Sequence, residues 1–83
     1  MSEIFDLLDT LSDGDGEVTF VLDGVERYKK HIDSVLHTED ENIEIFAEDK
    51  SAIFKESSVI KIAEKKYLVF DRESGRKMEI IFP

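Results

Sequence analysis

The sequence predicts a mainly β domain: one short N-terminal helix, then a small, strongly bent five-stranded barrel and an extra C-terminal β-hairpin. Apolar residues have helical spacing only in the first dozen positions, and short alternating segments with tight-turn residues between them make up the rest. The 83 residues allow a single domain over 1–83. A chain of this length buries a small core, so association with further copies would stabilise it.

A helix is predicted over residues 2–12. Ser2 can accept hydrogen bonds from the first free amide groups, as a helix cap does. The apolar residues recur at spacings of three and four, which places them on one buried face. That face consists of Ile4, Leu7, Leu8 and Leu11.

The segment LSDGDGEVTF, residues 11–20, resembles a calcium loop at first sight. In the twelve-residue loop of an EF-hand, Asp13 and Asp15 would occupy positions 3 and 5. Position 1 is then Leu11 and position 12 is Leu22, and neither side chain can bind calcium. The two glycines and the aspartates instead indicate a sharp turn from the helix into a strand, where they permit positive φ.

The barrel strands are predicted over 18–63. Residues 18–22 alternate in polarity and end at Asp23-Gly24, a strong hairpin signal. The second strand, 26–36, is long enough to bend around a small barrel. The remaining barrel strands are 43–47, 51–54 and 57–63, and the additional hairpin covers 67–82 with Ser74-Gly75 near its tip.

Charge is the strongest compositional signal, with a formal net charge of −9. Residues 1–49 hold fifteen acids and three bases (−12), whereas residues 50–83 hold eight bases and five acids (+3). The first part is therefore a poor surface for nucleic acid, and the second offers a local basic patch. Acids at the N-terminus, the absence of a long apolar run and the absence of cysteine predict a soluble cytoplasmic protein.

No catalytic or metal-binding pattern emerges. His31 and His37 lie six residues apart without cysteines or carboxylates at metal-ligand spacing, which favours surface or hydrogen-bonded histidines. The acidic run at 39–41 is typical of a solvated loop. We therefore expect no enzyme activity, no cofactor and no metal.

The stretch IFKESSVIKI, residues 53–62, resembles the second signature of Sm and Sm-like proteins. Phe54 stands at the apolar position, Lys55 at the basic position, and Val59 and Ile62 supply the closing apolar pair. VTFVLDGVERY is similar to the first strand and turn of this family, and NIEIF to its third strand, with Asn42 as the asparagine. The resemblance covers roughly residues 2–63.

The resemblance implies an SH3-type Sm barrel that assembles into a homo-oligomeric ring of five to seven copies and binds RNA. The implied RNA-binding residues are Asn42, Lys55, Lys61, Lys65 and Lys66. The implied interface between copies consists of Ala52, Phe54, Val59, Ile60 and Ile62. Glu56 replaces the family's glycine, and its carboxylate beside Lys55 opposes phosphate binding.

Three functions stay open at this point. The chain is an Sm-like ring with weak or altered RNA binding, or an acidic protein-interaction module of phage or mobile-element type. Such a module would bind a basic partner or mimic nucleic acid without binding RNA itself. The third reading is a structural scaffold.

Overall fold

The computed structural model describes residues 3–83 and contains one α-helix, eight strands and one short 3-10 helix. The elements are α1 (Glu3–Ser12), β1 (Glu17–Leu22), β2 (Glu26–His31), β3 (Ser34–His37), β4 (Asn42–Ala47), β5 (Lys50–Lys55), η1 (Glu56–Ser58), β6 (Ile60–Ala63), β7 (Lys66–Phe70) and β8 (Lys77–Ile81). The prediction of a mainly β domain with one short N-terminal helix is confirmed. The proposed Ser2 cap lies outside the described residues.

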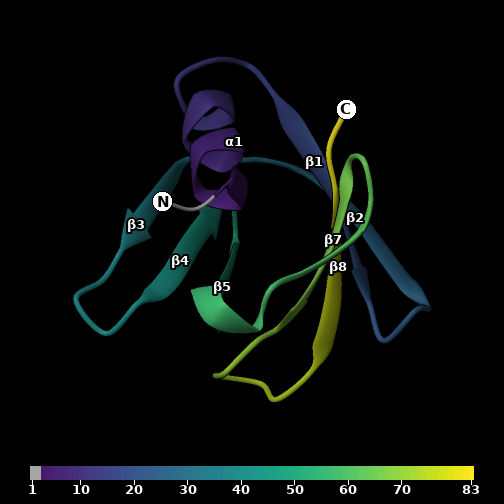
Figure 1. Ribbon diagram of the computed structural model, residues 1–83. Coiled ribbons are helices and arrows are strands. Elements are labelled where there is room, and N and C mark those ends of the chain that lie inside the picture. Colours follow the sequence, from purple (N-terminus) through teal and green to yellow (C-terminus); the bar gives the residue numbers. More distant parts are fainter. Residues whose placement is uncertain (1–2) are drawn as a thin grey trace.

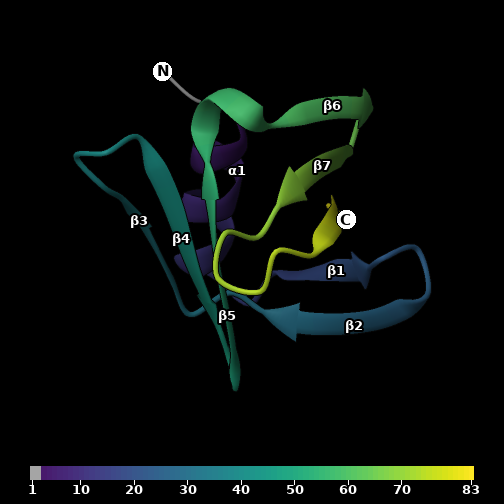
Figure 2. The same cartoon turned by 90° about the horizontal axis from the view of Figure 1, so that it is seen from below.

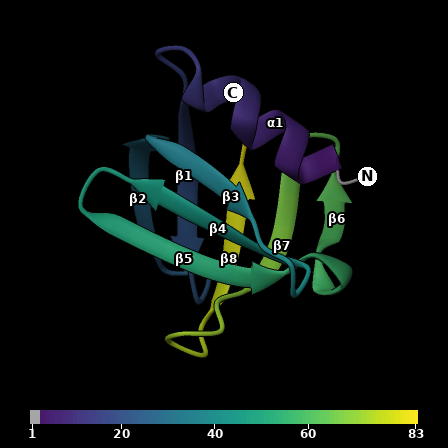
Figure 3. The same ribbon diagram turned by 90° about the vertical axis from the view of Figure 1, so that its left-hand side faces the viewer.

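The strands form two antiparallel sheets. The five-stranded sheet has the order β2-β1-β8-β7-β6, and the three-stranded sheet has the order β3-β4-β5. Figure 1 shows the two sheets facing each other with α1 above the space between them. The strands of the two sheets cross, as Figure 3 shows. In such packings the chain itself makes the corners by passing from one sheet to the other.

The first corner divides the predicted strand 26–36. β2 belongs to the five-stranded sheet and β3 to the three-stranded sheet, with Ile32 and Asp33 between them. The Ile32 side chain is fully buried at this corner, and the Asp33 amide donates a 2.8 Å hydrogen bond to the Phe46 carbonyl. The chain therefore bends as expected, but the bend separates two strands and does not curve a single one.

The second corner falls within the predicted strand 57–63, which is shorter than predicted. Residues 56–58 form η1, and only Ile60–Ala63 make a strand. The Glu56 amide donates to the Glu41 carbonyl at 2.9 Å, so the chain stays bonded to the three-stranded sheet before it leaves. Figure 2 shows β6 extending away from η1 toward the far side of the molecule.

The C-terminal hairpin departs most from the prediction. β8 pairs with β1, and β6 pairs with β7, so the hairpin β7–β8 lies within the five-stranded sheet. The prediction of one closed sheet over 18–63 with 67–82 outside it is therefore wrong. The physical reason is burial: Tyr67, Val69, Met78 and Ile80 are each at most 4% exposed.

The core lies between the sheets and under the helix. Ile4 and Leu8 of α1 are buried and Leu11 packs against the same cluster, as the helical spacing predicts, but Leu7 is 37% exposed. Each strand of the three-stranded sheet adds a buried residue, Val35, Ile43 and Phe54 among them. The one α-helix of residues 3–83 has neither the length nor the apolar character that crossing a bilayer requires.

Several turn residues have a positive φ. Asp23 and Gly24 both have positive φ, 52° and 74°, which is the geometry of the predicted two-residue hairpin turn. Gly75 at the tip of the β7–β8 connection has φ 73°. Glu48 adopts φ 55° in the β4–β5 turn, a position that few side chains favour.

The joint between α1 and β1 depends on space rather than on positive φ. Neither Gly14 nor Gly16 has a positive φ, which corrects the expected reason for these glycines. A Cβ on Gly16 would overlap the Leu11 side chain, whereas a Cβ on Gly14 would meet nothing. Gly16 therefore lets the chain pass close under the end of the helix.

Candidate functional site

The residues predicted to bind RNA do not form one cluster. Asn42 and Lys55 are cross-strand partners on β4 and β5. Arg72, in the β7–β8 loop, donates a hydrogen bond from Nη1 to Asn42 Oδ1 at 3.0 Å. The Asn42 cluster therefore consists of the Asn42–Arg72 contact and Lys55, the exposed residue opposite Asn42 on β5. No local pattern in the sequence singles out Arg72, because its contact depends on the fold.

Of the other three lysines of that set, Lys61 and Lys66 are engaged with acids. Lys61 Nζ donates to Glu3 Oε1 at 3.1 Å, and Lys66 Nζ lies 3.4 Å from Glu79 Oε1. The hydrogen bond between Glu3 and Lys61 lowers the pKa of Glu3 and raises the pKa of Lys61. Lys65 is exposed in the β6–β7 turn. Lys61 lines a cavity with Glu41 and Glu56, which adjoin Asn42 and Lys55 in the chain, whereas Lys65 and Lys66 lie at the β6–β7 turn and at the start of β7.

The predicted interface residues separate into two groups. Ala52 and Phe54 are 8% and 1% exposed and pack in the core, so their side chains are not available to another copy. Val59 is partly buried against the core. Ile60 and Ile62 are 48% and 47% exposed on β6, which is an edge strand of the five-stranded sheet.

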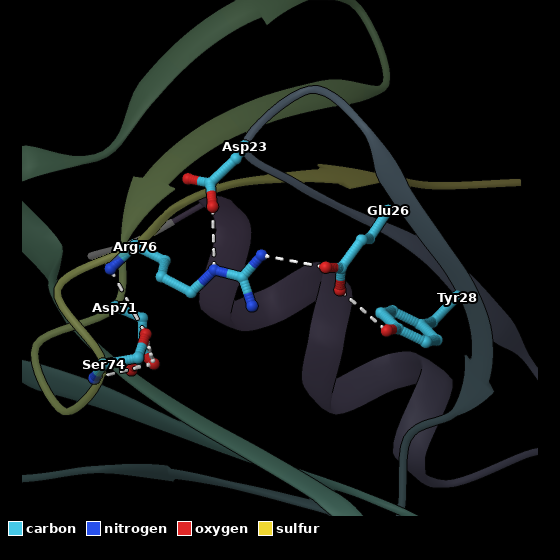
Figure 4. Close-up of polar contacts among 6 residues, drawn as sticks. All are labelled: Asp23, Glu26, Tyr28, Asp71, Ser74 and Arg76. Carbon is cyan, nitrogen blue, oxygen red and sulfur yellow. Dashed lines mark hydrogen bonds and ion pairs between the residues drawn. The ribbon is translucent and has the colours of Figure 1, made fainter.

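Asp71 connects the two sheets at the outer edge of β5. Its Oδ1 accepts a hydrogen bond from the Ile53 amide at 3.0 Å, and the Arg72 amide donates to the Ile53 carbonyl at 2.7 Å. Ser74 donates to Asp71 Oδ2 through its hydroxyl at 2.6 Å and its amide at 3.2 Å (Figure 4). Burial acts to raise the pKa of Asp71, but hydrogen bonds from Ser74, Ile53 and Glu73 outweigh it and lower the pKa.

Arg76 links the same loop to the β1–β2 hairpin. Its Nε donates to Asp23 Oδ2 at 2.8 Å, and its Nη2 lies 3.4 Å from Glu26 Oε1. The Tyr28 hydroxyl donates to the other oxygen of Glu26 at 2.8 Å (Figure 4). Arg76 therefore satisfies two carboxylates that would otherwise repel each other.

An apolar pocket lies beside this network, between the sheets. Its volume is about 160 Å³, and its walls include Phe20, Ile45 and Met78. Lys50 stands at the rim with Nζ 4.6 Å from the centre of the Tyr28 ring. Because Arg76, Asp71 and Tyr28 are already paired, this pocket offers an apolar shape but few free polar groups.

A second cavity, here called the acidic recess, lies where α1 begins. Its polar lining consists of Glu3, Glu41, Glu56, Ser57, Lys61 and Tyr67, and its volume is about 360 Å³. These residues come from α1, the β3–β4 loop, η1, β6 and β7. Figure 3 shows the start of α1, η1 and β6 on one side of the molecule. The recess thus combines three carboxylates with one ammonium group, one phenol and one serine hydroxyl.

The histidines have the roles that the sequence favours. His31 Nε2 contacts the Gly14 carbonyl at 2.7 Å and Nδ1 lies 3.3 Å from Asp33 Oδ1. The Gly14 hydrogen bond and the Asp33 carboxylate raise the pKa of His31. His37 Nε2 lies 2.8 Å from Glu56 Oε2. Within residues 3–83, no three His, Cys, Asp or Glu side chains are placed to hold a metal ion.

A run of unbalanced acids follows the helix and its joint to β1. This acidic strip consists of Asp6, Asp9, Asp13, Asp15 and Glu17, all exposed. In the described part of the chain, none of the five lies within ion-pair distance of a basic side chain. The first basic residue in the sequence is Arg27.

Comparisons with models of known protein families, with curated proteins and with solved structures find no match. The Sm-like resemblance therefore stays a prediction. The chemistry of the acidic strip, the acidic recess and the Asn42 cluster is the basis for a functional proposal.

Proposed function

We propose that this chain is an acidic protein-interaction module whose partner is a basic protein. The acidic strip is the observation that supports this function most directly. Its five exposed carboxylates have no basic neighbour within ion-pair distance in the described chain. A partner rich in Arg and Lys would supply the missing positive charge and would associate faster because of the long-range attraction.

The distribution of cations supports the same choice of partner. Lys30, Lys61, Lys66 and Arg76 each lie within 4.0 Å of a carboxylate of this chain. Four of the eleven Lys and Arg side chains are thereby neutralised locally, whereas none of the five carboxylates of the acidic strip is paired with a Lys or Arg of the described chain. A protein that itself binds nucleic acid fits as the partner, because its cations are spaced for phosphates and the strip would take the place of those phosphates.

Binding to a cationic peptide at several salt concentrations tests this proposal. We expect affinity for a lysine- and arginine-rich peptide at low salt and a steep loss as salt screens the charges. The triple variant Asp9→Asn, Asp13→Asn, Asp15→Asn should bind at least about tenfold more weakly, since three charges at the contact are removed.

The matched control carries the same change in net charge away from the strip, in Glu39→Gln, Glu64→Gln and Glu73→Gln, all exposed positions. Equal losses in the two triple variants would show that only net charge matters. Absence of binding by the unmodified chain at low salt would refute the proposal.

A second candidate is a divergent Sm-like ring that binds single-stranded RNA weakly. The cross-strand pair Asn42–Lys55 supports it, because those two positions carry the resemblance and Arg72 adds a cation beside them. Titration of oligo-U and oligo-A at low salt tests the RNA contact. Light scattering tests the ring, whose remaining exposed apolar contacts would be Ile60 and Ile62. A monomeric mass together with no oligonucleotide affinity would exclude this candidate.

A further inference from the structure

The acidic recess contains a polar group that the described chain leaves unsatisfied. Tyr67 is 2% exposed, and its buried hydroxyl lies near the Glu3 and Lys61 side chains but makes no hydrogen bond of good geometry with any described residue. The Glu3 carboxylate lies near enough to raise the pKa of Tyr67 beyond the effect of burial, yet it directs Oε1 at Lys61. A buried hydroxyl without a partner costs stability, so a ligand that bonded it would gain free energy.

Lys61 is the cation that now occupies the recess. Its Nζ lies 3.1 Å from Glu3 Oε1 and 5.8 Å from the centre of the Tyr67 ring. The Lys61 and Glu3 side chains are 43% and 61% exposed. An exposed ion pair of this kind adds little stability, so another cation can replace the Lys61 ammonium.

The other two carboxylates belong to Glu41 and Glu56, whose backbone segments are bonded to each other. The Glu56 amide donates to the Glu41 carbonyl at 2.9 Å, which fixes the β3–β4 loop against η1. Glu41 adopts φ 61°, an uncommon conformation for this residue type. Glu56 Oε2 is buried, with His37 Nε2 2.8 Å away. Three carboxylates leave the recess acidic even with the Lys61 ammonium group and the neighbouring His37 imidazole counted against them.

We infer that the acidic recess binds the guanidinium group of an arginine from the basic partner, which displaces Lys61 from Glu3. This inference rests on the proposed function and names the side chain that anchors the partner. A planar guanidinium presents five N–H donors in a rigid fork, so it can reach carboxylates from several elements and the Tyr67 oxygen together. A lysine from the partner would only repeat the contact that Lys61 already makes.

Other ligand classes fit the recess less well. A phosphate would face three carboxylates and one lysine, and the net repulsion opposes its binding. A metal ion finds no group of three suitable ligands within the described residues. The phenol and the carboxylates are hydrogen-bond acceptors, and a guanidinium is a donor only, so the two sides are complementary.

Three eight-residue peptides provide the probe, in which glycine alternates with arginine, lysine or uncharged citrulline. Binding is measured by calorimetry or fluorescence anisotropy at low salt. We expect the arginine peptide to bind about fivefold more tightly than the lysine peptide, because bidentate bonds to carboxylates are available to arginine alone. The citrulline peptide should show no affinity, since it carries no charge.

Two variants of the recess should weaken arginine binding. Glu56→Gln removes one carboxylate, and we expect a loss of about fivefold. Tyr67→Phe removes only the hydroxyl oxygen, and we expect a loss of about threefold in affinity together with a higher melting temperature. Glu73→Gln in the β7–β8 loop serves as the control for charge. Melting curves followed by circular dichroism show whether each variant folds.

Lys61→Met should act in the opposite direction. Removing the Lys61 ammonium group frees Glu3 for the partner's arginine. The Lys61→Met variant should therefore bind the arginine peptide about threefold more tightly than the Lys29→Met variant, which loses the same charge on β2. Equal affinity for the arginine and lysine peptides, or equal effects of Lys61→Met and Lys29→Met, would overturn the inference. If wild-type binding then remains salt-dependent and sensitive to the acidic strip, the proposed function stands; if no cationic peptide binds, both proposals fail.

Discussion

Replacement of Asp71 by alanine should weaken the contact between the two sheets. The Asp71 carboxylate accepts hydrogen bonds from the Ile53 amide, the Glu73 amide and both donors of Ser74. Asp71→Ala leaves the Ile53 amide without an acceptor at the edge of β5, which costs about 1–3 kcal/mol. The bonds within the loop add about 0.5–1 kcal/mol each where water does not replace them.

The sum is a loss of about 4 kcal/mol in the free energy of unfolding, taken from the middle of these ranges with all three loop bonds lost. For a domain of this size, each kcal/mol lowers the melting temperature by about 4–8 °C. Urea unfolding followed by circular dichroism measures the change directly. Asp71→Asn keeps one acceptor oxygen, so it should lose less than half as much as Asp71→Ala.

The effect of Asp71→Ala should also depend on pH. The pKa of Asp71 is lower in the folded chain than its ordinary value of 3.8. A carboxylate with a lowered folded pKa adds stability that is fully present above the unfolded pKa and is lost as pH falls through the folded pKa. The difference between the wild type and Asp71→Ala should therefore shrink below about pH 4. A loss under about 1 kcal/mol at neutral pH, or a difference unchanged in acid, would refute this role.

Three further changes test the fold and the assembly. Leu8→Ala removes a fully buried side chain from α1 and should cost about 2–5 kcal/mol in urea unfolding; a loss below about 1 kcal/mol would mean that the helix does not close the core. Gly16→Ala should destabilise the joint by about 0.5–1.5 kcal/mol because its Cβ would force the Leu11 side chain out of its rotamer, whereas Gly14→Ala should be nearly neutral. If copies associate through β6, Ile60→Ser with Ile62→Ser should reduce the mass measured by light scattering; an unchanged multi-subunit mass would place the contact elsewhere.

Local features of the fold were predictable because they depend on neighbouring residues. The spacing of Ile4, Leu8 and Leu11 predicts α1, and Asp23-Gly24 predicts the first hairpin. The predicted strand 26–36 failed at Ile32–Asp33 because a change of sheet leaves the alternation of side chains almost unaltered. Alternation shows which side chains are buried and does not show which strand lies alongside.

The C-terminal hairpin was misplaced for a different reason. The Sm-like resemblance ends near residue 63, so residues 67–82 had no position in that arrangement. Their own residues carry part of the missing information, since residues 67–70 are all apolar with Tyr67 and Val69 buried, and Met78 and Ile80 are buried on either side of Glu79. Two strands with one apolar face each indicate part of a core.

The candidate site was only partly accessible to sequence reasoning. Asn42 and Lys55 were named together and lie together, because the strands that carry them are adjacent in the chain. Arg72 and Asp71 were missed because their partners come from other strands, as far as thirty residues away. Residues from five elements line the acidic recess. Local sequence patterns do not predict that such distant segments lie together.

The construction of β6 has a consequence for how Lys61 is held. All four side chains of Ile60–Ala63 are exposed, and the strand is bonded to β7 alone with an irregular register. The backbone amides of β6 should therefore exchange with heavy water sooner than those of β1 or β8, because this strand can detach while the apolar interior stays intact. Lys61 therefore lies on a strand that can detach by itself. A cation from the partner can displace Lys61 from Glu3 while the rest of the molecule stays folded.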